Sequence, residues 1–87
     1  MSLAEGTVPV DESTEKHYHA VSDEIYVITD GIGIIEIEGE SREVEKNDCV
    51  FISTRRKHMI KNIGRVPLKI LCICSPPYSH DDTYIVY

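Results

Sequence analysis

Short segments rich in β-branched and aromatic residues recur along the chain, each followed by turn-forming residues, and this alternation restricts the fold most. No segment shows a helical periodicity that outcompetes its interpretation as a strand. The clearest turn signal is Asp30-Gly31, which predicts a type I′ hairpin because both central positions of that turn need a positive φ. About eight short strands separated by turns indicate an all-β barrel or two-sheet sandwich. The expected strands cover residues 3–10, 16–20, 24–29, 32–38, 41–45, 49–53, 58–62 and 66–74.

The length of 87 residues predicts a single domain, residues 1–87, with no room for a second core. Residues 1–3 are interpreted as an added leader and are left out of the functional reasoning. No stretch approaches the roughly 20 apolar residues that cross a bilayer, and no signal peptide is recognisable. The net charge of −6 argues against nucleic acid as a partner. The basic run at residues 55–57 is interpreted as a solvated turn.

Cysteine usage indicates a reducing compartment. The chain has three cysteines, Cys49, Cys72 and Cys74, which is an odd number without a disulfide framework. The spacing of Cys72 and Cys74 suits neither a zinc knuckle nor a redox pair. We therefore expect Cys72 and Cys74 to pack as small hydrophobic side chains, and we predict a cytoplasmic protein.

Two histidines flank Tyr18, and on a strand both would point to the same face because side chains alternate. Glu24 and His58, on other expected strands, could reach the same space inside a small barrel. Mixed nitrogen and oxygen ligands suit Mn, Fe, Co, Ni, Cu or Zn, and exclude an all-oxygen calcium site. A metal that prefers six ligands would keep two positions for water or substrate. The predicted ligands are His17, His19, Glu24 and His58.

The spacing of these residues resembles the two motifs of the cupin superfamily, in which small β-barrels supply metal ligands. The first motif runs from Asp11 through His17, His19 and Glu24 to Gly31, and only its opening glycine, here Asp11, is replaced. The second falls on Asn47, Ser53, Arg55, His58 and Asn62. It keeps the histidine and the final asparagine, and replaces the glycine, the proline and the second glycine. Asp11 and Asn47 can stand in for glycine, whereas Arg55 is expected to reshape the loop before His58.

The resemblance covers roughly residues 4–78 and implies a double-stranded β-helix, or jelly-roll, barrel with a divalent metal at the four ligands. The stretch from His58 to Leu68, with the later Asp81-Asp82, is also similar to cupins of the sugar-phosphate isomerase type. It is equally similar to small cupins without assigned activity. Cupins include isomerases, epimerases, lyases, dioxygenases and sensing domains, so the resemblance implies a site rather than a reaction.

Three functions stay open at this stage. The first is a metal-dependent enzyme acting on a small oxygenated metabolite such as a sugar, a sugar phosphate or an organic acid. By strand parity, Tyr26 and Arg56 are its weak candidates for catalytic or substrate contacts, the arginine through a carboxylate or phosphate. The second is a non-catalytic module that binds a small ligand, and the third is a structural metal that stabilises a small barrel.

Exposed sheet edges predict a homodimer. The expected edges are residues 3–8 and 84–87, and unpaired strand edges invite pairing with another chain. We also expect the tail, residues 78–87, to pair with a sheet or with another chain. The anticipated partners are a small-molecule ligand and a second copy, without nucleic acid or membrane.

Overall fold

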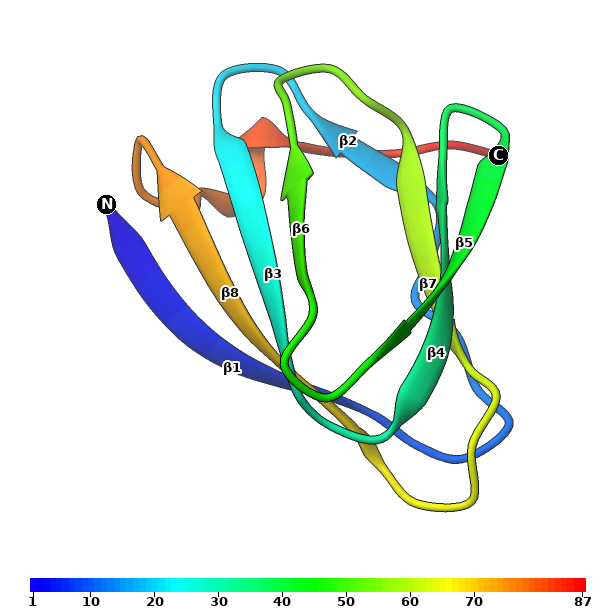
Figure 1. Cartoon of the computed structure of the whole chain (residues 1–87). Helices are drawn as coiled ribbons and strands as arrows, with labels where there is room; N and C mark the ends of the chain where they lie inside the picture. Colours follow the sequence, from blue (N-terminus) through cyan, green and yellow to red (C-terminus); the bar gives the residue numbers. More distant parts are fainter.

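Two antiparallel sheets face each other in the computed structural model, which describes residues 1–87 (Figure 1). One sheet has the strand order β1-β8-β3-β6 and the other β5-β4-β7-β2-β9. The all-β prediction is confirmed. The strands are β1 (Ser2–Val8), β2 (His17–His19), β3 (Asp23–Asp30), β4 (Ile32–Ile37), β5 (Glu40–Glu45), β6 (Cys49–Ile52), β7 (His58–Asn62), β8 (Leu68–Ser75) and β9 (Thr83–Ile85), with a short 3-10 helix η1 at His80–Asp82.

The eight expected strands are all present, and β9 adds a ninth from the tail. β9 pairs with β2, so that His19 lies opposite Thr83. Prolines account for two of the strand limits that differ from expectation. β1 ends at Val8 and β8 begins at Leu68, because Pro9 and Pro67 have no amide hydrogen for a ladder.

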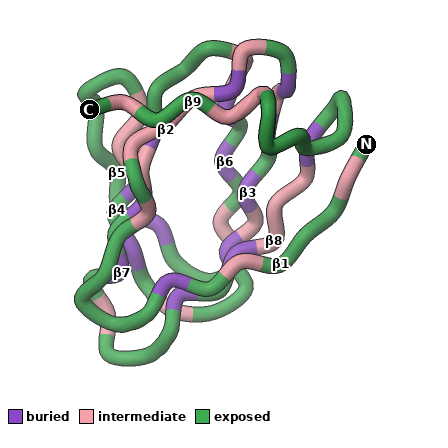
Figure 2. Tube along the Cα trace, turned by 180° about the vertical axis from the view of Figure 1, so that it is seen from behind, coloured by how far each residue is buried: buried purple, intermediate pink, exposed green.

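The core lies between the sheets and is built by alternation. Along β3 and β6, buried side chains alternate with more exposed ones (Figure 2). The two inner faces therefore meet in a single cluster, as expected when two half-apolar sheets pack. Its ten buried residues are Val8, Tyr26, Ile28, Ile35, Val44, Val50, Ile52, Ile60, Leu68 and Ile70.

The prediction of a type I′ turn at Asp30-Gly31 is wrong, because the backbone there does not have two residues with positive φ. Only Gly31 has a positive φ there (89°), and the β3–β8 register shifts between Ile28 and Asp30. Gly31 is needed for close packing as well, because a Cβ would lie 3.0 Å from the Leu68 Cα. The turn with two positive φ values instead joins β4 to β5, at Glu38 (49°) and Gly39 (82°).

Three residues at glycine positions of the motifs adopt left-handed backbone themselves. The φ angles are 67° at Asp11, 77° at Asn47 and 68° at Arg55. Asp and Asn tolerate this region, whereas for arginine it costs roughly 1–2 kcal/mol. A short hydrogen bond from the Arg55 N–H to the His19 carbonyl (2.7 Å) supports the arginine in this conformation. The loop before β7 is thereby tied to β2.

The sandwich has two open sides, since each sheet ends in two edge strands. On one side β1 and β9 border a cavity, and on the other β5 and β6 border a second cavity. No helix in the structure is long and apolar enough to cross a lipid bilayer.

Candidate metal centre

The four predicted ligands converge from both sheets. β2 supplies His17 and His19, β7 supplies His58, and β3 of the opposite sheet supplies Glu24. Each residue offers a ligand atom, and these atoms all lie within 4.8 Å of one another. His17 is directly opposite His58 in the β2–β7 pair, with ring centroids 4.3 Å apart. The structure thus brings together all four residues, close enough to hold one metal ion.

Two buried polar atoms at the centre of this cluster have no hydrogen-bond partner. Glu24 Oε1 lies 2.7 Å from His19 Nε2 and 3.2 Å from His58 Nε2. In spite of these short distances, the geometry leaves Glu24 Oε1 and His58 Nε2 without hydrogen bonds. Glu24 is only 4% exposed and His58 only 1%. Unpartnered buried polar atoms are costly, so a cation that accepts these lone pairs fits the donor set.

Partners on the far side of each ring fix the tautomers that metal binding requires. Nδ1 of His17 lies 2.8 Å from the Glu15 carbonyl, and Nδ1 of His58 lies 2.9 Å from the Arg56 carbonyl. Because a carbonyl only accepts, each Nδ1–H must donate, and in the neutral ring Nε2 keeps a free lone pair. Such outer contacts are typical of histidine ligands to metals.

His19 has a hydroxyl partner instead of a carbonyl. Its Nδ1 lies 3.3 Å from Thr83 Oγ1, and the Thr83 hydroxyl itself donates to the Ser79 carbonyl (3.2 Å). With its hydrogen used in that way, Thr83 accepts from the His19 Nδ1–H. All three Nε2 atoms are then free to face Glu24.

The electrostatics of the metal-free cluster favour an ionised carboxylate. Burial by itself would raise the pKa of Glu24, but the contacts and charges of His19 and His58 outweigh it and lower the pKa to about 2. The pKa of His19 is raised, chiefly by its contact with Glu24. The pKa of His17 is lowered, chiefly by burial, so this ring stays neutral at pH 7.

A cavity of about 360 Å³ opens onto the cluster from the side bordered by β1 and β9. Its size falls at the small end of the range for ligand pockets. No lysine or arginine lines it. The lining residues are Ser2, Ala4, Thr14, Glu15, His17, His19, Glu24, Tyr26, Cys72, Cys74, Tyr78, Thr83 and Ile85.

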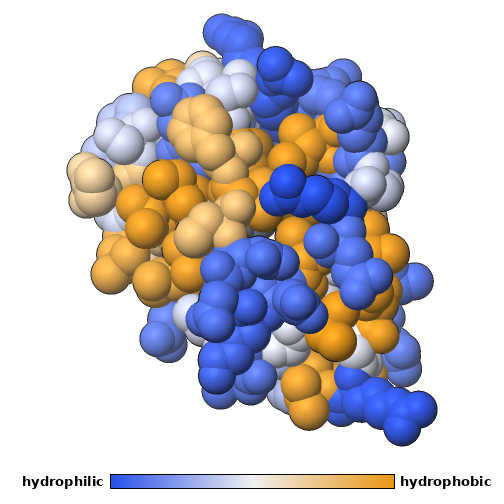
Figure 3. Space-filling model, viewed as in Figure 1, coloured by the Kyte–Doolittle hydropathy of each residue, from blue (hydrophilic) through white to orange (hydrophobic).

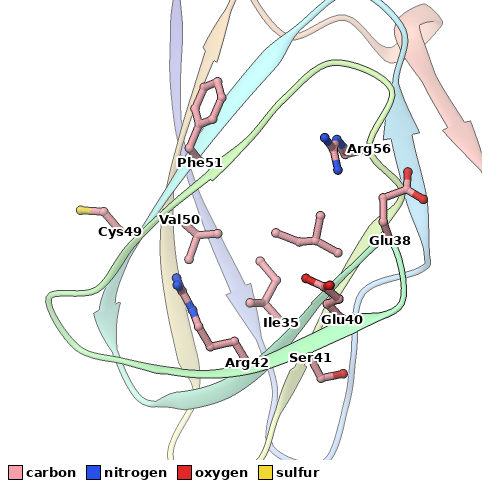
Figure 4. Close-up of a pocket in the computed structure, with 10 residues that line it drawn as sticks. Ile35, Glu38, Glu40, Ser41, Arg42, Cys49, Val50, Phe51 and Arg56 are labelled. Carbon is pink, nitrogen blue, oxygen red and sulfur yellow. The ribbon is translucent and has the colours of Figure 1, made fainter.

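Tyr26 lies in this cavity and Arg56 does not. The Tyr26 ring is 5.8 Å from that of His58, and burial raises its pKa well above the usual value. Arg56 follows a turn before β7, and its side chain lines the cavity on the opposite open side (Figure 4). Only its backbone carbonyl reaches the cluster, through His58. The strand parity used for the prediction fails because Arg56 precedes the strand.

The cysteines of β8 also face the centre. Cys74 Sγ is 3.7 Å from Glu24 Oε2, and Cys72 lines the same cavity. Burial, followed by the charge of Glu24, raises the pKa of Cys72 to about 12 and that of Cys74 to about 11. Thiols with such pKa values stay protonated and unreactive at neutral pH, which agrees with their interpretation as small packed side chains.

The expected pairing of the tail with a sheet is confirmed by β9, but its contact with the ligand histidine His19 was not predicted. The Asp82 carboxylate accepts hydrogen bonds from the backbone N–H groups of Ala20, Val21 and Ser22 (2.9–3.2 Å), and these bonds hold its pKa low against the effect of burial. This contact anchors η1 and β9 beside β2 and so places Thr83 at His19. The Asp81-Asp82 pair was a usable signal, whereas nothing in the sequence singled out Thr83.

Asn62, the last residue of the second motif, supports the fold at a distance from the ligands. Its side chain is 1% exposed, donates to the Val8 and Val66 carbonyls, and accepts from the Gly64 N–H. Asn62 thus joins β7 to the ends of β1 and of the loop before β8.

Known proteins resemble this chain in sequence and in fold. The protein MJ1618 of Methanocaldococcus jannaschii is 51% identical over 85 residues, which are 98% of this chain and 68% of that protein. A mannose-1-phosphate guanylyltransferase of Klebsiella pneumoniae is 33% identical over 73 residues, which are 84% of this chain but only 15% of that protein.

Among solved structures, a predicted oxalate decarboxylase of Thermotoga maritima superposes with a TM-score of 0.79 at 28% identity. The match covers 83% of this chain and 63% of that one, so the chain spans less than two thirds of that protein. The cupin domain profile matches residues 4–74, which include all four clustered residues. The chain is therefore a small member of the cupin family.

Proposed function

We propose that this cupin binds one divalent transition-metal ion through His17, His19, Glu24 and His58 and acts there on a small oxygenated metabolite. The observation that supports this most directly is the pair of buried, unpartnered atoms, Glu24 Oε1 and His58 Nε2, at the centre of the cluster. Three imidazoles with free Nε2 atoms and one carboxylate match the ligands of Mn, Fe, Co, Ni, Cu and Zn.

The charges of the site favour an uncharged or singly charged metabolite. A divalent ion held by three neutral imidazoles and one carboxylate leaves a net charge of about +1 for the ligand. The cavity offers no lysine or arginine to a second anionic group, and Glu15 borders it. A sugar or a monocarboxylic acid is therefore favoured over a sugar phosphate or a dicarboxylate.

Chain residues would position such a ligand rather than react with it. When bound, the metal supplies a Lewis acid that polarises a ligand oxygen. Ala4, Tyr78 and Ile85 offer an apolar wall to the rest of the molecule. Tyr26, with its high pKa, keeps its proton and can donate a hydrogen bond to a ligand oxygen.

Metal content tests the core of the proposal. Wild-type protein purified without added metal should contain close to one divalent ion per chain. The His17→Ala variant, purified in the same way, should contain much less, because it lacks one of the four ligands. Elemental analysis measures this. Equal metal content in the two proteins would contradict the proposal. Calorimetric titration of the loaded protein with a monocarboxylate and with a phosphate ester then tests the preference for a single charge.

A non-catalytic role remains the second candidate, and one observation favours it. The titratable side chains that line the cavity beside the proposed ligands include Tyr26, Cys72 and Cys74, and all three have pKa values raised away from neutrality. None of these three is suited to proton transfer at pH 7. A drop of several degrees in melting temperature on EDTA treatment, without turnover of any tested ligand, would indicate a binding module or a structural metal.

We further propose that the protein acts as a cytoplasmic homodimer. The unpaired cysteines support a reducing compartment. β1 and β9 are both edge strands, which supports association with a second copy.

A further inference from the structure

Glu24 has two cross-strand neighbours in its own sheet, and only one of them can donate a hydrogen bond. The β3–β8 register places Glu24 directly opposite Cys74, and the β3–β6 register places it opposite Ile52 on the other side. Ile52 is buried and apolar, so it offers the carboxylate no polar contact. Within this row across the sheet, the hydrogen-bond donor available to the Glu24 side chain is therefore the thiol of Cys74.

Alternation along the strands fixes both side chains of this pair inside the sandwich. Glu24 is 4% exposed and Cys74 is 3% exposed. Ile25 and Ile73, their neighbours along the two strands, point to the opposite side because side chains alternate. On that outer side of the sheet apolar side chains gather (Figure 3). Neither Glu24 nor Cys74 can turn outward without a shift of the strand register, so their contact is built into the fold.

The two carboxylate oxygens of Glu24 have different surroundings. Oε1 faces the imidazoles, at 2.7 Å from His19 Nε2 and 3.2 Å from His58 Nε2, and has no hydrogen-bond partner. Oε2 lies 3.7 Å from Cys74 Sγ, a distance at which the larger sulfur atom still donates. The carboxylate is thus held at Oε2 and presented to the imidazoles at Oε1.

The thiol hydrogen of Cys74 has its best acceptor in Glu24. On the other side of Cys74 the register places Ser2 of β1, whose hydroxyl oxygen already accepts the Tyr78 N–H (2.7 Å). Hydrogen bonds to an ionised acceptor are roughly twice as strong as those between neutral groups, which favours the carboxylate. An ordinary thiol keeps its proton at pH 7, so Cys74 is a donor there.

We infer that Cys74 is a positioning residue of the candidate metal centre, whose S–H group holds Glu24 Oε2 so that Oε1 alone is available to a metal ion. The inference rests on the metal binding proposed above. Without the thiol, the carboxylate could rotate about its last bond and offer either oxygen, or both, to a cation. Ligand number and geometry influence which metal a site prefers, so this contact contributes to the choice of metal.

Titration of the metal-free protein with Co²⁺ tests the positioning role, because the visible absorption of bound Co²⁺ reports the number and arrangement of its ligands. Cys74→Ala should lower the affinity by about 10-fold, at the lower end of the range for outer partners of metal ligands, and should change the spectrum. Cys74→Ser keeps a donor and should restore the wild-type spectrum and most of the affinity. Cys72→Ala is the matched control, since Cys72 lines the same cavity but lies opposite Tyr26, and it should behave like wild type.

Infrared absorption in the S–H stretching region tests the hydrogen bond in the absence of any metal. The band that disappears in Cys74→Ala should lie at a lower frequency than the bands of the other two cysteines, because a hydrogen bond to a carboxylate weakens the S–H bond. Glu24→Gln should move this band to a higher frequency, since a neutral amide is a weaker acceptor.

Each failure has a separate meaning, once melting temperatures establish that the variants are folded. If the wild type binds Co²⁺ and Cys74→Ala matches its affinity and spectrum, the positioning role is overturned and the proposed metal binding stands. Equal changes in Cys74→Ala and Cys72→Ala, or no recovery in Cys74→Ser, would overturn it too and indicate packing alone. An S–H band that Glu24→Gln leaves in place would exclude the hydrogen bond itself. Failure of the wild type to bind Co²⁺ would refute the proposed metal binding and, with it, the role of Cys74.

Discussion

The two open sides of the sandwich are bordered by similar edge strands but lead to opposite chemistry. Between β1 and β9, imidazoles and a carboxylate lie buried, with two polar atoms lacking partners. Between β5 and β6, a larger cavity of about 600 Å³ is lined by Arg42, Arg56, Glu38 and Glu40 above an apolar floor (Figure 4). These four side chains are exposed, so water can satisfy them.

The difference shows that burial, rather than the presence of charged residues, distinguishes the candidate site. An exposed arginine keeps its hydration and contributes little to any particular contact. The buried atoms on the β1/β9 side have lost their water and lack a protein partner in exchange. Four substitutions test this contrast, and they are given in descending order of expected effect.

Removal of one imidazole should have the largest effect. We expect His58→Ala to weaken metal affinity by roughly a hundred- to a thousand-fold, because each of four ligands carries about a quarter of the binding free energy. Titration with Zn²⁺ or Co²⁺ measures the change. A metal affinity within a few-fold of wild type would show that His58, on the β1/β9 side, is not a metal ligand.

Acid should remove the contribution that the ionised Glu24 carboxylate makes to the stability of the metal-free protein. Its folded-state pKa of about 2 lies below the usual value of 4.5, so the ionised group stabilises the fold above pH 4.5. That contribution, of the order of 3 kcal/mol, is lost as the pH falls toward 2. Urea unfolding at several pH values should therefore show a difference in unfolding free energy between wild type and Glu24→Gln. This difference should disappear as the pH falls from 4.5 to 2. A difference in unfolding free energy that does not change with pH would contradict the ionised state assigned to Glu24.

Removal of the Thr83 hydroxyl, which contacts His19 Nδ1, should have an intermediate effect on metal affinity. Thr83→Val keeps the shape and removes the acceptor of the His19 Nδ1–H. Loss of such an outer partner typically costs about 10–100-fold in metal affinity. Thr7→Val, at an exposed position of β1, is the matched control and should bind like wild type. Equal affinities for the two variants would exclude a positioning role for Thr83.

Arg56→Ala should have the smallest effect. Its guanidinium lies on the β5/β6 side, and the carbonyl that serves His58 survives the substitution. We expect unchanged metal affinity and a change in unfolding free energy within about 0.5 kcal/mol. A clear loss of metal binding would contradict this expectation, because it would show that the β5/β6 side contributes to the candidate metal centre.

Sequence reasoning recovered the strands from local rules, and the four clustered residues from those rules together with the spacing of the two motifs. Alternation and turn residues mark strands, and the spacing of His17 and His19 places their rings on one face. The position of Arg56 could not be found in that way, since parity holds only inside a strand. Thr83 was equally inaccessible, because its contact with His19 spans 64 residues and depends on how the tail folds back.

The pairing of β9 with β2 also sets an order of events during synthesis. His19 leaves the ribosome 64 residues before Thr83, the hydroxyl that fixes its ring. Until then Nδ1 and Nε2 can exchange the proton, and the ring can turn. The contact that orients the His19 ring therefore forms only after residue 83 has emerged and β9 has joined the sheet.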